Sequence, residues 1–256
     1  MTAPVSRPPL RGRLAAGDAQ VWQIAWLALL IVVVLLPESL RAVLLGLWGG
    51  AALLFRLAGD APLPPGGLSR YAAPLLAYLI LVAPGLAGQP ALTGAALAPV
   101  TLLLLAGLLP RRDTAPAAHD WAAQVAGVLW AAVGILTLAG LATIPEQLGS
   151  AAVVVLAGLL AYTAGRRAGL MQGMRERIAV GIGTTLALSA PIMLSSGIPA
   201  VAMVLGLVGG LFLANLAPPP PVLARPYLGA LILIQHQLLF VAPLTVVILW
   251  LVRTFL

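Results

Sequence analysis

Three polar residues, Gln235, His236 and Gln237, stand together in an otherwise apolar stretch near the end of the chain. An imidazole can ligate the metal of a haem or chlorophyll, or form a hydrogen bond with a quinone carbonyl. If a membrane-crossing helix starts near Leu233, His236 lies in its first turn, where it contacts water or a neighbouring helix. Three consecutive positions also spread over about 200° of a helix with 3.6 residues per turn. We therefore expect an interfacial or inter-helix role for His236, and keep cofactor binding as an alternative.

Other arrangements that support catalysis are missing from the sequence. The chain has neither cysteine nor lysine, which excludes disulfides, thiolate nucleophiles and Schiff-base chemistry. Ser189 has no histidine predicted on its side of the membrane, because we place His119 in a solvated loop and His236 at the opposite face. No glycine-rich phosphate loop with its lysine occurs. We expect a protein that is not an enzyme and that holds no metal and no cofactor.

The seven acidic residues fall in gaps between apolar runs or at the ends of those runs. A carboxylate-based antiporter or an intramembrane aspartyl protease needs an acid at membrane depth, and a magnesium-dependent transferase needs paired acids. The sequence therefore argues against all three classes. The acids are Asp18, Glu38, Asp60, Asp113, Asp120, Glu146 and Glu176.

The composition predicts an all-α, polytopic membrane protein with short loops. Hydrophobic residues make up 61% of the 256 residues and charged residues only 8%, whereas a soluble domain carries about 25% charged residues. The apolar runs do not alternate as the strands of a membrane barrel do, so helices must cross the lipid. We place nine spans at residues 21–37, 39–58, 71–88, 91–109, 121–143, 149–165, 178–196, 198–216 and 231–252, and eight spans are the alternative.

The arginines indicate the orientation of the chain. Twelve of the fourteen fall in alternate gaps, and only Arg41 and Arg253 fall in the gaps between. Basic residues are retained on the cytoplasmic side, so we expect a bacterial cytoplasmic membrane protein with its amino end inside and its carboxyl end outside. Residues 1–20 form a basic cytoplasmic arm, and residues 21–256 form one transmembrane domain. The formal charge of +7 is spread over five gaps, so we expect membrane lipids and no nucleic acid as partners.

The densest basic patch lies in the loop after the sixth predicted span. Its arginines are suited to an anionic lipid headgroup or an acidic partner, and the simpler interpretation is that they only set the orientation. The patch consists of Arg166, Arg167, Arg175 and Arg177.

Small residues recur every four positions on several predicted spans, for example at Gly46 and Gly50 and at Gly206 and Gly210. Small side chains let two helices approach closely in lipid. Together with the missing catalytic groups and short loops, these faces lead us to expect a non-enzymatic subunit that packs against other membrane subunits in a larger bacterial complex. Energy-transducing and photosynthetic complexes are the hosts we consider.

Two alternatives remain. The first is a permease or lipid-handling carrier in which Pro99, Pro191 and Pro243 break the fourth, seventh and ninth spans. Its polar contacts would be Thr184, Thr185, Ser189, Gln235 and Gln237. The second is a protein that binds haem, chlorophyll or quinone through His236.

Overall fold

The computed structural model describes residues 10–59, 68–106, 114–146, 149–167, 198–218 and 223–255. These residues form eight helices and one antiparallel pair of two-residue strands. Each helix overlaps a predicted span, and the seventh predicted span, 178–196, lies outside the described residues. The helices are α1 (Leu10–Leu35), α2 (Glu38–Ala58), α3 (Leu68–Leu86), α4 (Pro90–Ala106), α5 (Thr114–Ala142), α6 (Ala151–Arg167), α8 (Ile198–Leu216) and α9 (Pro226–Phe255), and the strands are β1 (Pro145–Glu146) and β2 (Gly149–Ser150).

Three helices, α1, α5 and α9, begin well before their predicted spans, at Leu10, Thr114 and Pro226 instead of residues 21, 121 and 231. Helix α1 starts at Leu10 and so includes part of the segment that we assigned to the amino-terminal arm. Helix α9 starts at Pro226, a residue type that suits the first helical position because its missing N–H needs no partner there. The expected start near Leu233 is therefore wrong, and His236 lies inside the helix instead of in its first turn.

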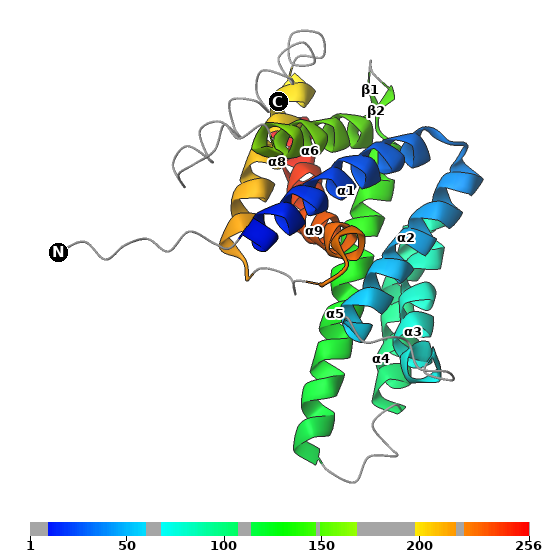
Figure 1. Ribbon diagram of the computed structural model, residues 1–256. Helices are drawn as coiled ribbons and strands as arrows, with labels where there is room; N and C mark the ends of the chain where they lie inside the picture. The colour runs from blue at the N-terminus through cyan, green and yellow to red at the C-terminus, as the bar shows by residue number, and fades with distance from the viewer. Residues whose placement is uncertain are drawn as a thin grey trace, which may run out of the picture.

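The described helices form two groups (Figure 1). Helices α2, α3, α4 and α5 pack together in one group, and α1, α6, α8 and α9 pack together in the other. Contacts of α9 with α5 and α2 join the groups. Helix α9 is the central element, because α1, α2, α5, α6 and α8 all contact it.

The first group has its turns at a common end. Glu38 after the α1–α2 turn, Gly88 in the α3–α4 turn and Thr143 after α5 all line one cavity. Arg56 lies in the last turn of α2, at the other end of that helix. The short, arginine-poor connections of this group therefore lie together, away from Arg56.

Glycines bring α8 into direct contact with the backbone of α9. A Cβ atom at Gly206 would collide with Thr245, and one at Gly210 would collide with the backbone of Val241. Both Val241 and Thr245 are fully buried. The predicted packing role of the Gly206–Gly210 pair is confirmed, and its partner is a helix of the same chain.

Three described helices are long and apolar enough to cross a membrane: Glu38–Ala58, Ala122–Ala142 and Pro226–Phe255. Shorter apolar helices cover Ala19–Leu35, Tyr71–Leu86, Leu92–Leu104 and Val201–Leu216. These lengths and compositions indicate membrane association, and the count of nine spans stays a prediction.

We expect Gly210→Leu to destabilise the fold by about 1–3 kcal/mol or more, because the new side chain would force α8 away from Val241. The measurement is the melting temperature of the purified chain in mild detergent. Gly94→Leu is the matched control, since nothing lies within 4 Å of a Cβ placed at Gly94. Equal melting temperatures for the two variants would contradict the close α8–α9 packing.

Candidate binding site

The polar residues of α9 are enclosed by neighbouring helices. Gln235 is fully buried, Gln237 is 6% exposed and His236 is 7% exposed. Three consecutive positions spread widely around a helix, and all three are covered because helices surround α9 on several sides. The expectation of a water-facing position for His236 is therefore corrected, whereas its contact with a neighbouring helix is observed.

Gln235 joins α9 to α5. Its amide nitrogen donates to the carbonyl oxygen of Ala131 at 2.9 Å and lies 3.4 Å from that of Trp130. Gly134 makes room for this amide, because a Cβ there would lie 2.7 Å from the Gln235 nitrogen. The side-chain oxygens Oε1 of Gln235 and Gln237 are both buried, and neither has a hydrogen-bond partner among the described residues. Two acceptors in the interior thus remain open to a donor.

His236 faces α8. Its Nε2 atom lies 3.3 Å from the carbonyl oxygen of Ala214, and its ring packs edge-on against Phe240 with centroids 5.2 Å apart. A metal bound at Nε2 would have to displace the contact with Ala214. Cofactor binding by His236 therefore stays an untested alternative.

Only part of the predicted arginine patch is described. Arg166 and Arg167 form the last turn of α6, where positive charge complements the carbonyl ends of a helix. Arg167 is exposed and Arg166 is half-buried. Arg175 and Arg177, and the polar contact candidates Thr184, Thr185 and Ser189, lie outside the described residues.

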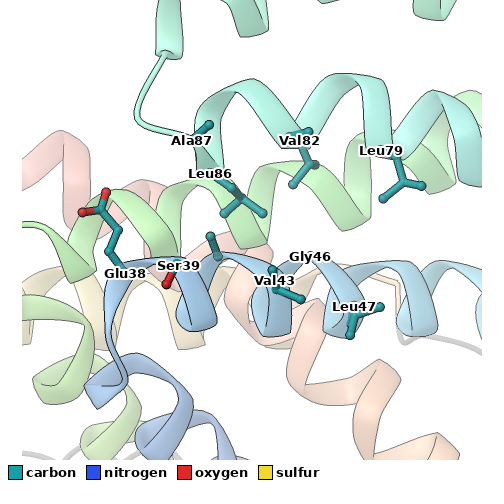
Figure 2. A pocket seen from close by; sticks show the side chains of 11 residues that line it. Glu38, Ser39, Val43, Gly46, Leu47, Leu79, Val82, Leu86 and Ala87 are labelled. Carbon is teal, nitrogen blue, oxygen red and sulfur yellow. The ribbon is translucent and has the colours of Figure 1, made fainter.

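A second site, which our sequence analysis did not identify, lies between α2 and α3. It is an apolar groove of about 820 Å³ with Glu38 and Ser39 at one end (Figure 2). Its walls are side chains spaced three or four positions apart, so that they share a helix face. They are Ala42, Val43, Gly46 and Leu47 of α2, and Leu79, Val82, Ala83, Leu86 and Ala87 at and after the end of α3.

A smaller and more polar cavity of about 440 Å³ adjoins this groove, with Glu38, Ala42 and Leu86 common to both. Arg41, Thr93 and Thr143 add a guanidinium and two hydroxyl groups to its lining. The hydroxyl oxygen of Thr93 is buried and has no hydrogen-bond partner. An apolar groove that ends in a few polar groups is the usual form of a small-molecule site.

Glu38 and Arg41 appear in the sequence only as an acid and a base at the end of a span. Their positions i and i+3 predict that the two side chains share a helix face. This spacing is the only feature of the sequence that points to the cavity. The opposing wall comes from α3, α4 and α5, and nothing in the sequence pairs those helices with this face of α2.

Within the described residues, no three histidine, aspartate or glutamate side chains come together to hold a metal ion. Comparison with protein-family models, with curated proteins and with solved structures finds no match for this chain.

We expect Gln235→Glu to lower the melting temperature more than Gln235→Leu does. A carboxylate would face the carbonyl oxygens of Ala131 and Trp130, which costs about 1–3 kcal/mol because acceptors would meet without a donor. Leucine removes the interaction and leaves no charge behind. A Gln235→Glu protein as stable as Gln235→Leu at pH 8 would contradict the observed orientation of the amide.

If His236 holds a haem or chlorophyll, the chain purified from its native membrane should absorb in the Soret or chlorophyll region, and His236→Ala should abolish that band. Phe240→Leu is a suitable control, because it removes the ring that packs on His236 and leaves the imidazole in place. A colourless protein, or a spectrum that His236→Ala does not change, would end the cofactor interpretation.

Proposed function

We propose that this chain is a non-enzymatic, multi-spanning subunit of a larger bacterial membrane complex. The observation that carries the proposal is the outer face of α4. Among the described helices, α4 has its main contacts with α3 and α5 only. Leu97 and Leu102, which flank this face on either side, are 48% and 68% exposed.

Small residues on the same helix suit this face to a second helix. Gly94 and Ala98 are four positions apart and both are exposed, and the space in front of Gly94 is open. In lipid, helices associate where small residues allow the backbones to approach. The α8–α9 contact illustrates this geometry in the same chain, with Gly206 and Gly210 in the equivalent roles.

The proposal includes the orientation of the chain. We place it in the bacterial cytoplasmic membrane with nine spans, the amino end inside and the carboxyl end outside. The common end of the turns near Glu38, Gly88 and Thr143 supports an alternating path for α2, α3, α4 and α5.

A second candidate function is a lipid-handling carrier or permease, and the apolar groove between α2 and α3 favours it. Pro99 lies within α4 and Pro243 within α9, as that alternative requires, whereas Pro191 lies outside the described residues. Proline removes one backbone hydrogen bond from a helix, and such breaks often lie beside a transport path.

A pull-down from native membranes in mild detergent tests the subunit proposal. We expect partner subunits at fixed stoichiometry with the unmodified chain, and at least a tenfold loss of them with Gly94→Leu, because leucine would hold a partner helix away from α4. The melting temperature of the variant chain alone should not change. Ala131→Leu, which alters a fully buried residue of α5, should instead impair folding. A chain that is recovered without partners, and whose stability rises with an added solute, would favour the carrier.

A further inference from the structure

The two adjoining cavities at the end of α2 have the form of a divided lipid site. The apolar groove extends from Glu38 and Ser39 toward Leu47 and Leu79 (Figure 2). The polar cavity shares this glutamate and is also lined by Arg41, Thr93 and Thr143. The first region is therefore suited to a hydrocarbon chain, and the second to a charged headgroup.

The headgroup region contains one charge of each sign. Among the described residues, neither Glu38 nor Arg41 has an ion-pair partner. Within the same residues, the Arg41 guanidinium donates a single hydrogen bond, to the carbonyl oxygen of Val34 at 3.5 Å. Positions three apart on a helix have Cβ atoms about 5–6 Å apart. This spacing is on the scale of the separation between the phosphate and the ammonium of one phospholipid headgroup.

We propose that this site binds one zwitterionic phospholipid, with its ammonium beside Glu38, its phosphate beside Arg41 and an acyl chain in the groove between α2 and α3. Charge complementarity selects this occupant. An anionic lipid would leave Glu38 facing a negative headgroup, and a cationic amphiphile would leave Arg41 facing a positive one. Guanidinium binds phosphate well because its donors match the phosphate oxygens.

The hydroxyl groups of the site suit the same ligand. The buried Thr93 oxygen has no hydrogen-bond partner among the described residues, and Thr93 lines the same cavity as Arg41. A phosphate or glycerol ester oxygen can accept from such a hydroxyl. The inference is independent of the proposed function, since a resident lipid is compatible with either a complex subunit or a carrier.

The test is lipid retention measured by native mass spectrometry. The full chain is reconstituted in bilayers of equal phosphatidylethanolamine and phosphatidylglycerol and then transferred to mild detergent. We expect one retained phospholipid, with phosphatidylethanolamine at least fivefold over phosphatidylglycerol. Glu38→Gln and Arg41→Gln should each lower its retention about tenfold, because each removes one charge-assisted contact. Glu38→Arg should shift the preference to phosphatidylglycerol.

Two controls separate specific binding from general charge effects and from misfolding. Arg253→Gln removes one exposed positive charge from the end of α9 and should leave retention unchanged. Ala42→Phe should block the groove, since Ala42 lines both cavities, whereas Val247→Phe on the exposed side of α9 should have no effect. Melting temperatures report the folding of each variant.

Equal retention of the two phospholipids would overturn the proposal, as would a preference that Glu38→Arg does not change. A photo-reactive side chain introduced at Val43, which lines the groove, should crosslink to lipid. A crosslink to a polypeptide instead would also overturn the proposal. None of these three results bears on the α4 pull-down, which measures a different surface.

Discussion

Large apolar side chains such as Leu35, Leu216 and Phe255 lie on the outside of the described helices, where contact with water would be unfavourable. Surrounding lipid would remove this cost, but it would offer no hydrogen bonds to the backbone. Each segment must then satisfy its own N–H and C=O groups, which makes helices the natural element. The same constraint removes the hydrophobic effect as the force between helices, so that close packing has to hold the bundle together.

Helix α9 shows how the chain meets that requirement. Gly206 and Gly210 of α8 and Gly134 of α5 bring two helices against it, and three further helices complete its enclosure. This enclosure makes room for the polar side chains of Gln235 and His236, which bond to carbonyl oxygens of α5 and α8. The polar segment therefore serves first to connect helices, and its unpartnered acceptors are the part of it that remains open to a ligand.

The sequence predicted the approximate positions of the eight described helices, because long apolar runs bounded by proline, glycine and arginine determine where helices can lie. It predicted the Gly206–Gly210 contact for the same local reason. It could not place His236 correctly, because the start of α9 at Pro226 extends the helix beyond the apolar run. It also could not identify the site at Glu38 and Arg41, since that site depends on which helices pack beside α2. Local patterns determine helices, whereas pairings between distant helices depend on side-chain packing.

The most direct test asks on which side of the membrane two helix ends lie. The chain has no cysteine, so an introduced cysteine is its only thiol, and labelling of the purified chain reports on that position alone. Ser39→Cys and Arg225→Cys place one thiol at an exposed position near the start of α2 and just before α9, respectively. In spheroplasts with an intact membrane, a membrane-impermeant maleimide should label Ser39→Cys at once and Arg225→Cys only after permeabilisation. Labelling of both positions before permeabilisation, or recovery of the chain in buffer without detergent, would contradict the proposed membrane topology.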